Sequence, residues 1–241
     1  MIRVLSFLLP LFIMISCIDG EEEITVNADA SGTFKVRYEF PSAAAAEIGP
    51  PAKYRRELER IDAEEEGIRI THQEIGFVRG KLLIHVEAEF DDVTDLLEIA
   101  DRQQENFIEG TGIGPGKLEN LLGGIHFALE GMKADFSRRL EIGSMLPEMV
   151  RNDPRLLLES EFRFTINLPI AIESSNAAEL SADRKSMSWK FLLRDYVDQP
   201  IVMKFRTEPL VPWWAWIFLT GILLLVLMGL CKLVRFLKAR P

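Results

Sequence analysis

Cysteine is nearly absent from this chain, and the two that are present, Cys17 and Cys231, stand close to its ends. The long stretch between them can therefore hold no disulfide, no cysteine-based metal site and no cysteine nucleophile of its own. Other catalytic signatures are missing too. No serine stands in a Gly-x-Ser-x-Gly setting, and no Gly-Lys-Ser/Thr ends the glycine-rich run at 110–116. The sequence therefore predicts a protein that is not an enzyme and that needs no cofactor.

Histidine is scarce as well, and its spacing gives no metal-binding motif. His72, His85 and His126 each stand alone in a strand-like or loop context, without His-x-x-x-His spacing. His72 and His85 can meet across a hairpin, but solvated strand histidines are the expectation. The adjacent carboxylates at 64–66 and 91–92 fit a solvated helix face and a helix cap. No metal site is expected.

Basic residues are outnumbered, with 28 Lys and Arg against 37 Asp and Glu and a net charge of −9. No acidic residue lies before position 17 or beyond 212, so the negative charge is concentrated in the part between them. Such an acidic surface argues against nucleic acid as a partner and against flat docking on anionic lipid. Solubility is the simpler explanation of the charge.

Charge is missing altogether from residues 213–231, WWAWIFLTGILLLVLMGLC, a run about as long as a helix needs to cross a bilayer. Tryptophans crowd its start and basic residues follow its end: Trp213, Trp214, Trp216, Lys232, Arg235, Lys238 and Arg240. Indole rings favour the membrane interface, and basic segments stay on the cytoplasmic side. A buried core helix, the alternative, needs neither feature. The run therefore predicts one transmembrane helix, a basic cytoplasmic tail over 232–241, and an extracytoplasmic domain before the helix.

The first 16 residues predict a signal peptide, because Arg3 precedes an apolar run that is too short to span a membrane once Pro10 is counted. The run ends in Met-Ile-Ser-Cys at 14–17, which resembles the lipobox of bacterial lipoproteins, with methionine where leucine is commoner. That resemblance implies that Cys17 is acylated and becomes the new N-terminus. A retained signal anchor is the alternative. Cys17 and Cys231 then lie on opposite sides of the membrane, so no disulfide joins them.

The region between the two predicted anchors has the pattern of an α+β domain dominated by antiparallel strands. After an acidic spacer at 21–23, alternating apolar and polar residues predict strands at 24–29, 33–40, 68–75, 81–90, 126–130, 136–142, 162–168, 187–193 and 201–206. Helical spacing predicts helices at 53–66 and 93–104, with weaker helical segments at 118–125 and 144–150. The glycine-rich run divides this region into an α+β part, 17–110, and a β-rich part, 111–209.

The closing segment, LPIAIESSNAAELSADRKSMSWKFLLRDY at 168–196, carries a family pattern. Pro169, Ser175, Asn176 and Trp189 fall on the positions of a proline, a Ser-Asn turn and a strand tryptophan in the LppM-like bacterial lipoproteins, which this segment resembles. Ile170 stands where that family often has glycine. The strand pair at 24–40 also resembles the family's start, whereas residues 45–155 show no match. The resemblance implies an envelope lipoprotein with an α+β ectodomain and no catalytic residues.

Two non-catalytic functions remain open from the sequence. The first is a membrane-tethered module that binds a lipid or an apolar peptide between the sheet and helices 53–66 and 93–104. The second is a structural or assembly factor that contacts other envelope proteins. An apolar pocket would favour the first function and a flat polar sheet the second, while histidines or carboxylates converging in a cleft would favour an enzyme.

Overall fold

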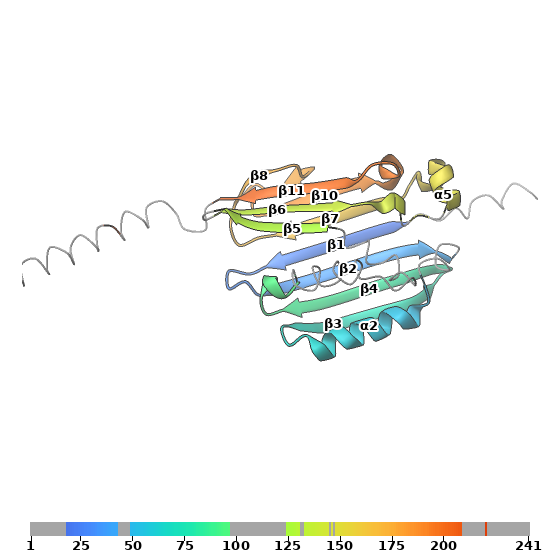
Figure 1. Cartoon of the computed structure of the whole chain (residues 1–241), viewed down its shortest axis with the longest axis horizontal. Coiled ribbons are helices and arrows are strands. Elements are labelled where there is room, and N and C mark those ends of the chain that lie inside the picture. The colour runs from blue at the N-terminus through green and yellow to red at the C-terminus, as the bar shows by residue number, and fades with distance from the viewer. Residues whose placement is uncertain are drawn as a thin grey trace, which may run out of the picture.

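Two β-sheets form the framework of the domain (Figure 1). The computed structural model describes residues 18–42, 49–96, 124–130, 133–144, 146, 148–208 and 220. Within them a seven-stranded sheet has the order β3-β4-β2-β1-β7-β10-β9, and a four-stranded sheet has the order β5-β6-β11-β8. The first comprises β3 (Ile68–Val78), β4 (Lys81–Phe90), β2 (Gly32–Pro41), β1 (Asp19–Val26), β7 (Glu161–Asn167), β10 (Ser186–Leu192) and β9 (Glu179–Leu180). The second comprises β5 (Gly124–Glu130), β6 (Lys133–Leu140), β11 (Ile201–Thr207) and β8 (Ile172–Ser175).

Helices are few and short in the described part. They are α2 (Pro51–Glu64), α5 (Glu148–Asn152) and 3-10 turns at Ile142–Ser144, Pro154–Leu157 and Leu193–Tyr196. Residues 93–96 are helical too, where a helix over 93–104 is predicted, and the rest of that helix lies outside the described residues. Pro51 begins α2, where its missing N–H costs nothing. The predicted class, an α+β domain rich in antiparallel strands, is confirmed.

One pairing joins distant parts of the chain. β1 runs antiparallel to β2 but parallel to β7, so that Glu22 faces Val36 on one side and Phe164 on the other. Strands from both sides of the glycine-rich run thus belong to one sheet. The run itself, 110–116, lies outside the described residues, and the division of the domain at that point stays a prediction.

The buried core lies on one face of the large sheet. The inward side chains of β2, β4, β7 and β10 alternate with polar outward ones, as the sequence pattern predicts. The four-stranded sheet packs on the β7–β10 half, where Phe136 stacks on Phe164 with ring centroids 6.5 Å apart. Helix α2 covers the β3 side of the other half (Figure 1). The domain therefore has two layers, with the large sheet as one of them.

The first strand departs from the prediction. The acidic residues expected to form a spacer, Glu21–Glu23, lie in the middle of β1, which ends at Val26 rather than at Asp29. The reason is that the inward-facing Glu22 finds a buried cationic partner in Arg138 across the two sheets. The short strands β8 and β9 lie between the predicted strands at 162–168 and 187–193, where no strand is predicted.

No helix of the described part is long and apolar enough to cross a membrane. The predicted transmembrane helix at 213–231 lies outside the described residues, apart from Thr220. The same holds for the signal peptide, for Cys17 and for the basic tail. These predictions stay predictions.

Candidate functional site

The half of the large sheet that faces α2 is a wide apolar surface. Its buried side chains come from three neighbouring strands: Val36, Tyr38, Phe40, Ile68, Ile75, Leu82, Ile84, Val86, Ala88 and Phe90. Helix α2 places one fully buried residue, Tyr54, and two half-buried ones, Leu58 and Ile61, against this surface. The other residues of α2 are mostly charged and exposed. The apolar stripe of the helix is therefore much narrower than the surface it faces.

Polar contacts hold α2 on the edge strand β3. Arg55 donates a hydrogen bond to the carbonyl oxygen of Ile75, and the backbone N–H of Ile70 donates to Asp62 Oδ1 at 2.7 Å. Val93 and Leu96, at the start of the second helical segment, pack against the neighbouring cluster of Ile68, Ala88 and Phe90. The two helical segments thus lie over the same apolar half of the sheet, which is where the sequence predicts a ligand site.

A buried ion pair joins the two sheets beneath the other half. Arg138 of β6 is 2% exposed and Glu22 of β1 is 1% exposed. Arg138 donates to both carboxylate oxygens of Glu22, with Nη2 lying 3.0 Å from Oε1, and the hydroxyl of Tyr38 donates to the same carboxylate. The guanidinium also lies 4.9 Å from the centre of the Phe164 ring. Both charges in this group are paired, so Glu22, Arg138 and Tyr38 form a buried contact between the sheets, called the clamp below.

Because of the clamp, we expect the stability of the folded state to decrease at high pH. Burial, followed by the negative charge of Glu22, raises the pKa of Tyr38 well above its ordinary value. The folded state therefore keeps the Tyr38 proton at pH values where the unfolded chain, with a tyrosine pKa of about 10, loses it. The stability that this provides is complete below pH of about 10 and decreases as pH rises further.

Urea unfolding of the full chain in mild detergent, measured at pH 9 and pH 11, tests this response. We expect the wild type to lose more stability between the two than Tyr38→Phe, and absorbance at 295 nm to show no ionisation of Tyr38 while the protein is folded. Equal losses in the two proteins would contradict the assignment.

The family-pattern residues come together around one side chain. The Trp189 indole N–H donates to Asn176 Oδ1 at 2.9 Å, and the backbone N–H of Lys204 donates to the same oxygen at 2.7 Å. Asn176 Nδ2 donates to the carbonyl oxygen of Val202 at 2.8 Å. The hydroxyl of Ser175 donates to the Lys204 carbonyl at 3.2 Å. These contacts tie β8, β10 and β11 together, so the pattern has a structural role. Pro169 lies apart from them, in the bend after β7.

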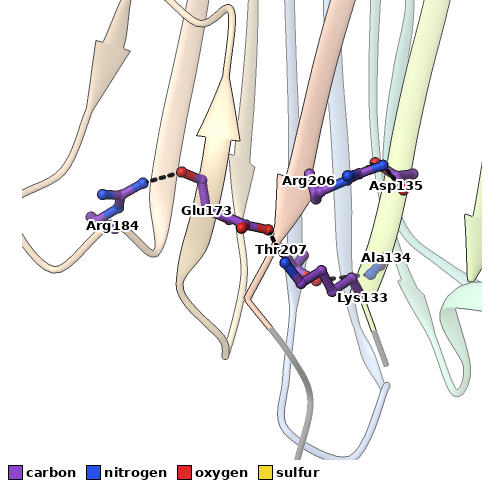
Figure 2. A network of polar contacts seen from close by, with 7 residues as sticks. All are labelled: Lys133, Ala134, Asp135, Glu173, Arg184, Arg206 and Thr207. Atoms are coloured by element: carbon purple, nitrogen blue, oxygen red, sulfur yellow. Dashed lines mark hydrogen bonds and ion pairs between the residues drawn. The ribbon is translucent and has the colours of Figure 1, made fainter. Parts of the chain in front are cut away.

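The outer face of the small sheet carries a shallow groove of about 450 Å³. Its polar lining includes His126, Ser137 and Lys204. Arg206 beside them is already paired with Asp135, with Nε and Nη2 lying 2.6 and 2.8 Å from the two carboxylate oxygens (Figure 2). His126 meets neither of the other histidines there. The groove is too open to enclose an apolar ligand.

Two of the three histidines do meet, contrary to the expectation of isolated strand histidines. The rings of His72 and His85 lie with their centroids 5.0 Å apart on the outer face of the β3–β4 pair. The hairpin register that brings them together was the alternative left open by the sequence. The slip in β3 that puts His72 on this face carries no signal in the residue pattern.

The domain has two stacked layers: the seven-stranded sheet forms one, and the four-stranded sheet with helix α2 beside it forms the other. It is an α+β domain rich in antiparallel strands. The chain is similar to the NMR structure of the folded domain of the LppM protein of Mycobacterium tuberculosis. The sequence identity is 12%, the TM-score is 0.45, and the match covers 81% of this chain and 91% of that one. No family model and no curated protein matches the chain.

Proposed function

We propose that this chain is a non-catalytic, membrane-tethered lipoprotein of the bacterial cell envelope, whose extracytoplasmic domain binds a lipid or an apolar peptide. The observation that supports this most directly is the mismatch between the broad apolar face of β2, β4 and β3 and the narrow stripe of α2. An elongated apolar molecule that enters between helix and sheet would bury the inner-face side chains that stay half-buried or exposed there: Phe34, Ile70 and Phe77. No acid, base or nucleophile is needed for such a role.

The two tethers predicted from the sequence fit a domain that lies along the membrane. Ile18, next to Cys17, is 9% exposed, and its backbone N–H donates to Ser160 Oγ at 2.9 Å, which leaves little slack at that end. β1, in the large sheet, starts at one end of the domain, and β11, in the small sheet, ends at the opposite end (Figure 1). The four residues 209–212 reach at most about 14 Å, whereas an eight-residue strand spans about 26 Å. Both tethers therefore reach one bilayer only if the strands run roughly along its surface.

A second function, contact with another envelope protein, is supported by the outer face of the large sheet. That face carries cross-strand ion pairs, such as Lys35–Glu87 at 3.7 Å, Lys81–Glu39 at 3.2 Å and Lys190–Glu161 at 2.6 Å. A charged surface of this kind suits a specific protein partner more than a lipid. The two functions use opposite faces of the sheet and can be tested together.

Native mass spectrometry of the full chain, extracted from membranes in mild detergent, distinguishes them. We expect a bound lipid or apolar peptide in the wild type. Ile61→Trp should remove it, because the larger side chain fills the space between α2 and the sheet. Glu59→Trp, on the exposed side of the same helix, is the matched control and should retain it.

Each other outcome has a separate meaning. A ligand retained equally by both variants would place it outside the α2 site and contradict the proposal. A bound protein in place of a small ligand would favour the second function.

A further inference from the structure

The outer face of the β3–β4 pair gathers three side chains of the kinds that bind transition metals. His72 and Glu74 come from β3, and His85 comes from β4. One ligand atom from each lies within 4.8 Å of the others. In the register of the pair Glu74 faces His85 directly, and His72 faces Glu87. These three residues, called the His72 cluster below, sit on paired strands and not on loops, so their backbones are held in place.

A β-bulge creates the cluster. From Ile68 and Ile70 a regular strand would point residues 72 and 74 to the same inner face, because side chains alternate with a period of two. The pairing of β3 with β4 shifts between Ile70 and His72, and the extra residue is Thr71. The shift turns His72 and Glu74 outward, onto the face that carries His85 and Glu87. Bulges often aim side chains at functional sites, and this one assembles the ligand set.

The surrounding charges leave the cluster free to bind a cation. Arg37 is paired with Glu39 at 2.7 Å, and Arg69 is paired with Glu89. Among the described residues, the carboxylate of Glu74 has no hydrogen-bond or ion-pair partner. Glu87 Oε1 lies 3.5 Å from Nε2 of His85 and 3.7 Å, through Oε2, from Lys35 Nζ. Glu87 can therefore orient the imidazole of His85 from beside the cluster, as carboxylates do for metal-bound histidines.

We propose that His72, Glu74 and His85 bind a zinc ion. Two imidazoles and one carboxylate are a ligand set that zinc accepts at about 2.0–2.2 Å, with water in the fourth position. Donor atoms so placed lie a little over 3 Å apart, so the side chains close by about 1–2 Å on binding. His72 and Glu74 are exposed and can rotate without disturbing the core. The proposal concerns binding alone and is independent of the apolar ligand on the other face of the sheet.

Isothermal titration of zinc chloride into the full chain tests the site, with the protein in mild detergent, stripped of metal and carrying no polyhistidine tag. We expect binding at pH 7.5 that weakens as the pH is lowered, because protons compete with metal ions for their ligands. His72→Asn and His85→Asn should each weaken binding by more than the roughly 10–100-fold that follows loss of an orienting neighbour. Glu74→Gln should weaken it too.

His126→Asn is the matched control, since His126 is an exposed strand histidine on the other sheet. It should bind zinc as the wild type does. Circular dichroism should show all four variants folded, because none of the changed residues is buried. Absence of zinc binding in the wild type, or equal affinity in the His72→Asn, His85→Asn and His126→Asn variants, would overturn the proposal.

Discussion

Arg138→Ala is expected to lower the free energy of unfolding by about 3–5 kcal/mol, because it leaves the Glu22 carboxylate charged and unpaired between the sheets. Glu22 is 1% exposed, so water cannot replace the lost guanidinium without opening the interface. The hydroxyl of Tyr38 remains as a donor to the carboxylate, but one neutral hydrogen bond offsets only part of the cost. Urea unfolding of the full chain in mild detergent, followed by circular dichroism, measures the change.

Two further variants distinguish the stability cost of losing an ion pair from the cost of leaving one charge buried and unpaired. Arg206→Ala removes an equally well-aligned partner of Asp135 on the outer face, where the side chains are 43% and 27% exposed, and should cost about 1 kcal/mol or less. The double variant Glu22→Met with Arg138→Met removes both buried charges at once and should recover most of the stability that Arg138→Ala loses. A similar loss for Arg138→Ala and Arg206→Ala would show that the clamp is not desolvated.

The Glu22–Arg138 pair of the clamp is a contact that could not be predicted from the sequence. The alternation of apolar and polar residues predicts the strands well, because each strand has one buried face and one solvated face. The same rule makes Glu21–Glu23 look like a spacer, since a glutamate on an inward position has no local partner. Its partner, Arg138, lies more than one hundred residues away, as does β7, the parallel neighbour of β1. Long-range pairing of this kind leaves no trace in local periodicity.

The candidate sites follow the same logic. The histidines stand 13 positions apart, and only the hairpin register together with the bulge after Ile70 decides whether they meet. A bulge adds one residue with no distinctive composition, so the sequence permits the meeting without requiring it. The Asn176–Trp189 contact also joins residues 13 positions apart, but the family pattern singled out both of them. Residues that belong to a sequence pattern are therefore better predicted than those whose meeting depends on strand register alone.

Trp189→Ala is expected to destabilise the domain by about 3–5 kcal/mol, which is the usual cost of removing a buried tryptophan. Trp189 is 1% exposed and stacks on Phe164 with ring centroids 5.6 Å apart. Its indole N–H also holds Asn176, whose side chain bonds to β11 as well. The substitution thus leaves a cavity between the sheets and loosens the contact that joins β8, β10 and β11.

A graded set of variants tests this account. Trp189→Phe keeps the stacked ring but removes the N–H donor, so we expect a smaller loss, about 1–3 kcal/mol. Lys190→Ala, the next residue, faces outward and should cost about 1 kcal/mol or less, although it loses its 2.6 Å contact with Glu161. Circular dichroism is the readout, because the tryptophans at 213, 214 and 216 also contribute to fluorescence. Equal losses for Trp189→Phe and Trp189→Ala would mean that the hydrogen bond to Asn176, and not the packing on Phe164, holds this part of the fold together.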